Sequence, residues 1–342
     1  MKVAVIGATG AVGREMTRLL EERRFPVDEF LPLASSRSGG RLVRFRGEDH
    51  EVGVLTTDAT RGVDVAFVSA GALTSSAFLP DIAASGTLCI DNSSAFRMDP
   101  DVPLSVPEVN PEALEGWPRP GIIAVPNCTT ITAVLPLGPL HRAARCTSLV
   151  LSSYQAVSGA GWKGTRELIE QVDKLGDDIE SLARPDRGTL PQGETFAKPI
   201  AFNVVAKVGE FEPDGFTSEE VKMMDEPRKI LSAPDMRVVA TSVRVPVVTG
   251  HAVSVLAEFA DPISPQEARA MLADASGVRL MDVLDAGAFP SPLDAAGGDD
   301  ALVGRIRQVP GRDDALVFFS CADNLRKGAA LDAIQIAEHL FR

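Results

Sequence analysis

Hydrophobic residues in the first third of the chain come in short runs that alternate with helical or loop stretches. The runs are Lys2–Ile6, Glu29–Leu33, Val63–Ser69, Thr87–Ile90 and Ile122–Val125. Such runs are typical of strands buried on both faces of a parallel sheet, where crossovers join each strand to the next. The pattern therefore predicts a doubly wound α/β sheet in this part of the chain.

The pattern changes after Cys128, where longer β-rich segments appear. They are Ser148–Ala156, Ala201–Val208, Met236–Val245 and Ala252–Ala260. These four segments predict a second, mostly antiparallel sheet packed with helices, which makes this part an α+β domain. Near the end of the chain, Ala315–Cys321 is predicted to form one further strand. The joint between the domains is expected near Cys128, where a cofactor and a substrate could meet.

Two segments of the second half have helical periodicity. Trp162–Ala183 places leucine, isoleucine and valine at spacings of three and four, and it is expected to cover the second sheet. Lys327–Leu340 is predicted to form an amphipathic helix at the end of the chain. Between the predicted strands, Arg184–Pro199 holds three prolines and two glycines and is expected to be a surface loop of unassigned function.

Composition and charge restrict the class of protein. The 342 residues are 45% hydrophobic and 24% charged, which indicates a folded protein of roughly two domains. A net charge of −13 argues against general binding to nucleic acid or to an anionic membrane surface. The uncharged run Gly121–Leu140 has the length of a membrane span, but its three prolines favour a strand followed by a helix.

The cysteines and histidines show no metal-binding spacing. Cys89, Cys128, Cys146 and Cys321 are scattered without a CxxC pair, and no HExxH motif occurs. No metal is predicted, and reduced thiols in the cytoplasm are expected. The chain enters a strand at its N-terminus with no export signal, which agrees with a cytoplasmic protein.

A glycine motif follows the first apolar run directly. It reads Gly7-Ala8-Thr9-Gly10-Ala11-Val12-Gly13 and precedes the helical stretch Arg14–Glu22. Glycines in such a strand–turn–helix allow the backbone to approach a pyrophosphate at a helix N-terminus. The spacing GxxGxxG is a variant of the dinucleotide fingerprint, and a structural tight turn is the alternative.

The end of the second predicted strand bears on the choice of nucleotide. NAD-preferring folds commonly place an acidic residue there, but this chain has Ser35-Ser36-Arg37-Ser38. An arginine flanked by serine hydroxyls suits a phosphate, so NADP is predicted over NAD. A solvated arginine in a turn is the alternative for Arg37.

Cys128 lies in Pro126-Asn127-Cys128-Thr129-Thr130, between a proline that ends a strand and an apolar stretch that could open a helix. The N–H groups and positive end of a helix lower a thiol's pKa and can bind an oxyanion, so an acyl-transfer nucleophile is predicted. A buried structural cysteine is the alternative.

Three further residues could serve the same chemistry. Gln155 precedes the small-residue loop Ala156–Gly161, which can approach a substrate or a nicotinamide closely. Arg244 and His251 flank a turn marked by Pro246 and Gly250. An arginine fork matches a carboxylate and a histidine can transfer a proton, although a structural histidine is the simpler interpretation of His251 alone.

Together these motifs resemble the aspartate-β-semialdehyde dehydrogenase family over essentially the entire chain. The segments that carry the resemblance are VAVIGATGAVG near the start, DNSSAFR at 91–97, VPNCTT at 125–130, YQAVSGAG at 154–161, AFNV at 201–204, EEVKM at 219–223, RVPVVTGH at 244–251 and DNLRKGAA at 323–330. The resemblance implies a Rossmann-type NADP domain of residues 1–127 plus about 322–342, completed by the C-terminal helix. It implies a catalytic and dimerisation domain of residues 128–321, and a homodimer.

The resemblance also implies roles for single residues. Cys128 matches the nucleophile, Asn127 a substrate and oxyanion contact, His251 the acid/base residue, Gln155 the residue that orients the acyl group and Arg244 the one that binds the substrate carboxylate. Glu219 matches the partner of the substrate ammonium group, and Arg97 with Lys222 the phosphate site. Without the resemblance, Arg97 could be a capping or surface arginine, and Glu219 and Lys222 part of a solvated helix face.

The cofactor contacts form the largest group of implied site residues, and they come from the glycine motif, the strand ends and the loops that follow. They are Gly7, Thr9, Gly10, Ala11, Val12, Gly13, Ser35, Arg37, Ser38, Gly71, Ser158, Gly159 and Asn324.

The reaction that the resemblance implies is the NADPH-dependent reductive dephosphorylation of L-aspartyl-4-phosphate to L-aspartate-4-semialdehyde through a cysteine thioester. Such a step belongs to lysine, threonine, methionine and diaminopimelate biosynthesis. N-acetyl-γ-glutamyl-phosphate reductases and glyceraldehyde-3-phosphate dehydrogenases share this chemistry, but the surroundings of their cysteines differ from Pro-Asn-Cys-Thr-Thr. A nonenzymatic NADP-binding sensor is the alternative from another class, and it need not keep Cys128, Gln155, Arg244 and His251 together.

Overall fold

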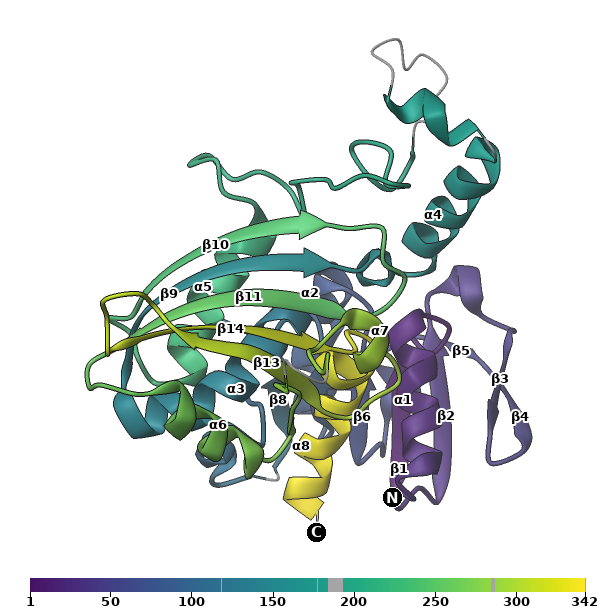
Figure 1. Cartoon of the computed structure of the whole chain (residues 1–342). Coiled ribbons are helices and arrows are strands. Elements are labelled where there is room, and N and C mark those ends of the chain that lie inside the picture. The colour runs from purple at the N-terminus through teal and green to yellow at the C-terminus, as the bar shows by residue number, and fades with distance from the viewer. Residues whose placement is uncertain (118, 177, 184–192, 284–286, 342) are drawn as a thin grey trace.

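The computed structural model describes residues 1–117, 119–176, 178–183, 193–283 and 287–341. Two six-stranded sheets organise these residues (Figure 1). The first sheet is parallel throughout and has the order β5-β2-β1-β6-β7-β8. Its strands are β1 (Lys2–Ile6), β2 (Glu29–Ala34), β5 (Gly53–Val54), β6 (Val65–Val68), β7 (Leu88–Asp91) and β8 (Gly121–Ala124).

Both faces of the first sheet are covered, which confirms the doubly wound prediction. Helices α1 (Ala11–Glu22) and α8 (Leu331–Phe341) pack on one face, and α2 (Ala72–Ala84) packs on the other. The chain reverses its winding between β1 and β6, because β2 lies on one side of β1 and β6 on the other. In doubly wound sheets, ligands bind at this switch point, beyond the carboxyl ends of the strands.

The second sheet has the order β10-β9-β11-β14-β13-β12 and is mixed. The three pairings between β9, β11, β14 and β13 are antiparallel, whereas the outer strands β10 and β12 pair in parallel. The strands are β9 (Cys146–Gln155), β10 (Arg237–Arg244), β11 (His251–Phe259), β12 (Val278–Leu280), β13 (Ala301–Gln308) and β14 (Ala315–Ala322).

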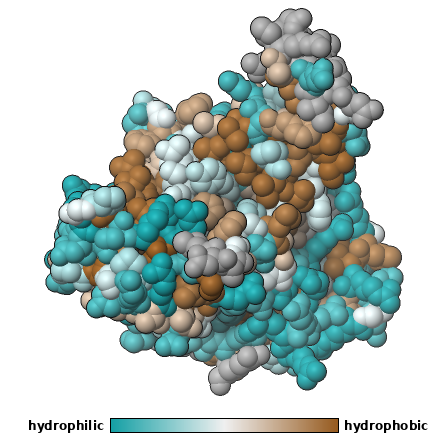
Figure 2. All heavy atoms as spheres, viewed as in Figure 1, coloured by the Kyte–Doolittle hydropathy of each residue, from teal (hydrophilic) through white to brown (hydrophobic). Residues whose placement is uncertain are grey.

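Helices cover one face of this sheet, and most of the other face is open. The covering helices are α3 (Cys128–Ala144), α5 (Ser218–Ile230) and α6 (Pro265–Ala273). Among the described helices, the short α7 (Pro292–Ala295) is the one that packs on the opposite face, near β13 and β14. Figure 2 shows hydrophobic residues gathered over this sheet and over α4 in the upper half of the view.

The C-terminal segment returns to the first domain, as predicted. After β14 the chain forms η7 (Arg326–Ala330), a π-helical turn, and continues into α8 beside α1. The predicted helix Lys327–Leu340 therefore begins with one wider turn. Such turns occur often at functional sites.

The expected helix Trp162–Ala183 is wrong in its length and in its packing. α4 (Trp162–Leu175) ends where Gly176 adopts a left-handed conformation at φ 49°, and η5 (Asp178–Ala183) is a separate turn. The apolar face of α4 packs against η4 (Val157–Ala160) and a cluster around Ile200, so α4 projects beyond the sheet and does not cover it (Figure 1).

The expected strand Ala201–Val208 is also wrong. Only Val205 pairs with the sheet, through two hydrogen bonds to Arg244. The Asn203 side chain donates to the Pro199 carbonyl and accepts from the Val204 N–H, and these local bonds replace a regular ladder. Of the expected loop Arg184–Pro199, residues 184–192 lie outside the described residues, and 193–199 form neither helix nor strand.

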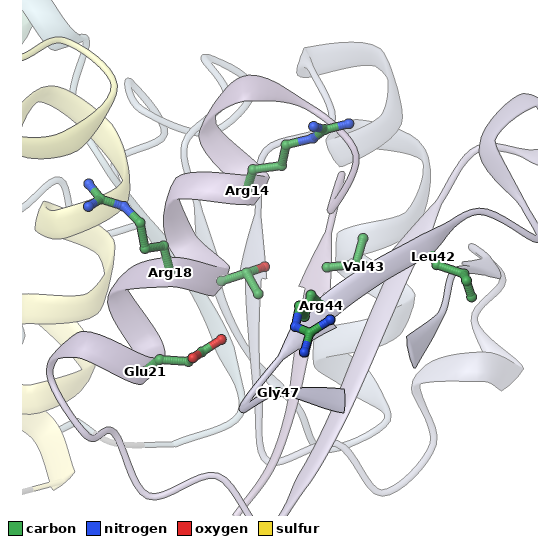
Figure 3. Close-up of a pocket in the computed structure, with 8 residues that line it drawn as sticks. Arg14, Arg18, Glu21, Leu42, Val43, Arg44 and Gly47 are labelled. Atoms are coloured by element: carbon green, nitrogen blue, oxygen red, sulfur yellow. The ribbon is translucent and has the colours of Figure 1, made fainter. Parts of the chain in front are cut away.

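A small hairpin of β3 (Leu42–Phe45) and β4 (Glu48–Glu51) lies beside α1. A groove of about 370 Å³ runs between the hairpin and the helix (Figure 3). Its charges are mixed, because Glu21 lines it together with Arg14, Arg18 and Arg44. Arg18 is already paired with Glu15 on its own helix.

Candidate active site

The glycine motif forms the turn from β1 into α1 at the switch point of the first sheet. Gly7 has φ 89°, and a Cβ there would lie 2.2 Å from the Ser69 carbonyl oxygen, so only glycine fits. A Cβ on Gly13 would lie 2.2 Å from the Gly7 carbonyl oxygen. The backbone of this turn can therefore approach a pyrophosphate, and Gly10 is the N-cap that directs the first N–H groups of α1 outward.

A cavity of about 320 Å³ connects this turn with the second domain. Many of the predicted site residues line it, together with residues that the motifs did not single out. The lining residues are Gly10, Ala11, Val12, Ser69, Asn92, Arg97, Pro126, Asn127, Cys128, Ser158, Gly159, Gly161, Asn324, Leu325, Gly328 and Ala329.

Cys128 is the first residue of α3 and reaches this cavity. The Asn127 side-chain oxygen caps the helix by accepting from the N–H groups of Thr129 at 2.9 Å and Thr130 at 3.3 Å. On the other side of the cysteine, a Cβ on Gly328 would lie 2.8 Å from the Cys128 Cβ. Cys128 is thus held between a cap and the backbone of η7.

The expectation that the helix N-terminus lowers the pKa of the Cys128 thiol is wrong for the free protein. Burial and the nearby Glu219 carboxylate raise this pKa to about 11, although Arg97, Arg244 and Thr129 act in the opposite direction. The thiol is therefore protonated at neutral pH until the surroundings change.

His251 is the first residue of β11 and is completely buried. The Ala156 backbone N–H donates to its Nδ1 at 3.0 Å, so the neutral ring carries its proton on Nε2. Nε2 has no hydrogen-bond partner among the described residues. Burial and Arg244 lower the pKa of His251 to about 3, so the ring is neutral and offers one free donor.

Arg244 ends β10 directly beside Gln155, the last residue of β9. It is buried, and its NH1 group donates to the Ala156 carbonyl at 2.7 Å. Its Nε has no partner within the described ranges, which leaves a buried donor for an anion. An unsatisfied guanidinium nitrogen in a buried position is well suited to a carboxylate.

Glu219 connects the remaining polar side chains. It accepts from Asn127 Nδ2 at 2.9 Å, from Gln155 Nε2 at 3.1 Å and from Lys222 Nζ at 3.2 Å. Burial alone would raise the pKa of its carboxyl group. Lys222 and these hydrogen bonds nevertheless hold the pKa below its usual value, so Glu219 is charged.

Arg97 is buried at the edge of the cavity, in the loop after β7. It donates to the carbonyls of Val125 and Asn92 and to Glu226 Oε1, the last at 2.9 Å. Lys222 lies on α5, where it forms an ion pair with Glu219. Arg97 and Lys222 therefore come from different elements and do not share a carboxylate partner.

Ser158 and Asn324 meet at the lining of the cavity. The Asn324 amide donates to the Ser158 hydroxyl at 3.0 Å and accepts from the Gly250 N–H at 2.9 Å. These bonds join the loop after β9, the turn before β11 and the segment after β14. Gly159 follows Ser158 and lies close to Arg244 and His251.

The other predicted cofactor residues lie outside the cavity lining. Ser35 precedes the turn η1 (Ser36–Ser38), which carries the exposed Arg37 and the half-buried Ser38, and Gly71 caps α2. They follow β2 and β6, the two strands that flank β1 at the switch point. Thr9 lies in the glycine turn, where its carbonyl accepts from Arg14.

The motif analysis missed Ser69, Glu226 and Gly328. Ser69 directly follows β6, the position where loops at a switch point meet a ligand. Gly328 falls within the segment DNLRKGAA, but nothing in that segment shows that its Cα faces the nucleophile.

The fold and the cavity define a class of protein, the two-domain dehydrogenases. In this architecture a nucleotide-binding parallel sheet is joined to a mixed-sheet domain, and the site lies at the joint. Family models support both halves. A model described as "Semialdehyde dehydrogenase, NAD binding domain" matches residues 2–117, and one described as "Semialdehyde dehydrogenase, dimerisation domain" matches residues 137–327.

Individual relatives narrow this class of dehydrogenase to one family. Aspartate-semialdehyde dehydrogenases from Corynebacterium glutamicum and Aquifex aeolicus are 47% and 44% identical to this chain, covering 99% and 100% of it and 99% and 98% of their own lengths. The structure of aspartate semialdehyde dehydrogenase II from Vibrio cholerae complexed with ASA superimposes with a TM-score of 0.90 at 41% identity, covering 99% of this chain and 97% of that one. The chain belongs to the aspartate-semialdehyde dehydrogenase family, and the resemblance found in the sequence is confirmed.

None of the helices among the described residues has the length and hydrophobicity needed to cross a bilayer. The same residues contain no group of three or more His, Cys, Asp or Glu side chains arranged to hold a metal ion.

Proposed function

We propose that this protein catalyses the NADPH-dependent conversion of L-aspartyl-4-phosphate to L-aspartate-4-semialdehyde and its reverse, through a thioester on Cys128. One observation carries the proposal: the same cavity takes in the N-terminus of α1, the Cys128 side of α3 and Arg97. A nucleotide site, a nucleophile and a cation for phosphate thus open into one space.

The substrate's charged groups have matching partners in the site. The carboxylate fits the guanidinium of Arg244, whose Nε lacks a partner among the described residues. The ammonium group fits Glu219, the buried carboxylate that is held in its charged form. Gln155 donates to Glu219 and lies next to Arg244 across the strand pair, where it can orient the acyl group.

Arg97 and Lys222 form the proposed phosphate site. The guanidinium NH1 and NH2 groups of Arg97 donate one hydrogen bond each, to Glu226 and to the Asn92 carbonyl, and each has one further hydrogen for an anion. Lys222 adds a second positive charge, partly exposed. Two cations next to the acyl group stabilise the phosphate as it leaves.

In the biosynthetic direction, Cys128 sulfur forms a bond to the acyl carbon and the carbon–oxygen bond to phosphate breaks. The thiol, whose pKa in the free protein is about 11, must give up its proton as this bond forms, and the phosphate group of the substrate is the base that can carry the proton away as it leaves. NADPH, when bound at the glycine turn, supplies the hydride that reduces the thioester. The Nε2 proton of His251 can donate a hydrogen bond to the substrate oxygen and stabilise the negative charge that forms there. When the carbonyl re-forms, the carbon–sulfur bond breaks, the aldehyde leaves and the Cys128 thiolate takes up a proton from solvent.

NADP is proposed over NAD because Arg37 and its serine neighbours follow β2 and no carboxylate stands at that strand end. Arg37→Ala should weaken NADP binding and leave NAD binding nearly unchanged. Cofactor titrations of both forms measure the ratio of the two affinities. An unchanged ratio would remove this part of the proposal.

A homodimer is proposed through the open face of the second sheet. The family model described as a dimerisation domain covers this sheet. Val239, Val150, Leu256 and Val317 lie side by side across four strands on that face, and the first two are about half exposed. A row of exposed apolar side chains on a sheet is the kind of surface that a second copy covers.

The decisive assay follows NADPH formation from aspartate semialdehyde and NADP, with and without inorganic phosphate. Turnover should require phosphate, and Cys128→Ala should be nearly inactive. A trapped reaction should place an aspartyl adduct on Cys128 by peptide mass. Turnover without such an adduct, or an adduct on another side chain, would refute the mechanism.

A further inference from the structure

Glu226 is a buried carboxylate on α5 to which the motifs assign no role. Its side chain is 1% exposed, and its two oxygens bind two different parts of the site. Oε1 accepts from Arg97 NH1 at 2.9 Å, and Oε2 accepts from the Asn127 backbone N–H at 2.7 Å. One carboxylate thus links the phosphate-site arginine to the residue before the nucleophile.

α5 holds Asn127 both at its backbone and at its side chain. Glu226 binds its backbone N–H, and Glu219 accepts from its side-chain amide. With its amide nitrogen fixed, the side-chain oxygen of Asn127 points at the first N–H groups of α3. The start of α3, and with it Cys128, is therefore positioned by two carboxylates of one helix.

Lys229 continues the same face of α5. Residues 219, 222, 226 and 229 are spaced three and four apart, so they lie in one row along the helix. The Lys229 ammonium donates to the carbonyls of Arg97, Asp99 and Val102. The loop that carries Arg97 is thus fastened to α5 at its backbone as well as at its guanidinium.

We infer that Glu226 is a positioning residue that sets the distance between the phosphate-binding Arg97 and the Cys128 loop. The inference rests on the proposed function, since it takes Arg97 as the phosphate site. Only a carboxylate can serve, because both groups facing it are donors and a carboxylate has no donor of its own. An amide at this position would turn its N–H₂ group toward one of the two donors.

The test is Glu226→Gln, assayed with aspartate semialdehyde, NADP and varied inorganic phosphate. KM for phosphate should rise about tenfold to a hundredfold, and kcat should fall, while KM for NADP stays unchanged. Asp225→Asn is the matched control: it neutralises the neighbouring carboxylate, which pairs with Arg228 on the same helix, and it should leave all three constants unchanged. If Glu226→Gln does not fold, Glu226→Asp keeps the charge but is too short to reach both donors, and it should raise the same KM.

Arg97→Met separates this inference from the proposed function. If Arg97→Met raises KM for phosphate and Glu226→Gln does not, the inference about Glu226 is wrong and the phosphate site stands. If Arg97→Met leaves KM unchanged, the phosphate site itself is wrong. In the double variant the KM should be no higher than in Arg97→Met alone, because Glu226 acts on phosphate through Arg97.

Discussion

At the scale of single residues, burial determines the protonation of the two groups that are proposed to carry the chemistry. Burial raises the pKa of Cys128 to about 11 and lowers that of His251 to about 3. Both side chains are therefore neutral near pH 7 in the free protein. A thiolate–imidazolium pair does not form there, and activation of the thiol depends on what the substrate brings.

The titration of Cys128 can be followed by alkylation with iodoacetamide in the free protein. Only the thiolate reacts, and below a pKa of about 11 the thiolate fraction rises with pH. The alkylation rate should increase about tenfold per pH unit from pH 7 to pH 9, without a plateau. Peptide mass identifies the modified cysteine. A plateau near pH 7 would show that the thiol is already activated without substrate.

Arg244 provides a prediction about geometry rather than charge. Arg244→Lys keeps the positive charge but replaces a planar fork by an ammonium, and the bond to the Ala156 carbonyl is lost. We expect kcat/KM for aspartate semialdehyde to fall by about tenfold to a hundredfold. Steady-state kinetics measure this, with KM for NADP as the internal control. Wild-type kinetics would contradict the carboxylate assignment.

Local motifs identified the residues around the nucleophile because proline, asparagine, cysteine and glycine have local signatures. Glu226 has none. Its partners Arg97 and Asn127 lie 129 and 99 positions away, and the cluster EEVKMMDEPRK looks like a solvated helix face. A sequence shows that a helix is charged, but burial of a charge becomes visible only when the tertiary structure supplies its partners.

At the scale of elements, the parts of the fold that were predicted from the sequence are again those with a local sequence signature. Five of the six strands of the first sheet are apolar runs buried in the sheet, and their positions were predicted to within two residues, whereas the two-residue edge strand β5 was not predicted. α5 has few apolar residues, so its hydrophobic pattern does not mark it clearly as a helix. The local sequence signal for this helix is its capping box of Thr217 and Glu220, which the structure shows at the start of the helix. The failed strand Ala201–Val208 had the right residues, but local hydrogen bonds of Asn203 compete with the ladder.

The turn η7 provides a prediction at this scale. Gly328→Ala would add a Cβ 2.8 Å from the Cys128 Cβ, so Cys128 or the turn must shift. A displacement of about 1 Å near reacting atoms can cost about a hundredfold in rate, and we expect a fall in kcat of this order. Ala333→Gly is the control: it lies further along the same C-terminal segment, in α8, and should lower the thermal midpoint without a comparable loss of kcat. Equal effects on kcat would mean that η7 has no special relation to Cys128.

At the scale of the whole molecule, the C-terminal segment joins the two domains. Arg326 in η7 is buried and bonds to Glu15 and Glu22 of α1 and to Asp299 in the second domain. Lys327, also buried, binds Glu108 and Gln335. The helix that would receive the nucleotide and the turn against Cys128 are therefore connected by one ion-pair network.

The proposed dimer gives the prediction that involves the whole molecule. Val239 is 51% exposed on the open face of the second sheet, on an edge strand, where a lysine can be accommodated in the isolated subunit. In a dimer that buries this face, the lysine would place two unpaired charges near the contact, since the same patch meets itself. We expect Val239→Lys to shift the mass measured by light scattering from two subunits to one, with an unchanged circular dichroism spectrum. Leu73→Lys, which removes an apolar side chain that is 90% exposed on α2, should remain dimeric. A monomeric wild type, or a Val239→Lys variant that keeps the dimer mass, would show that the open face is not the contact between subunits.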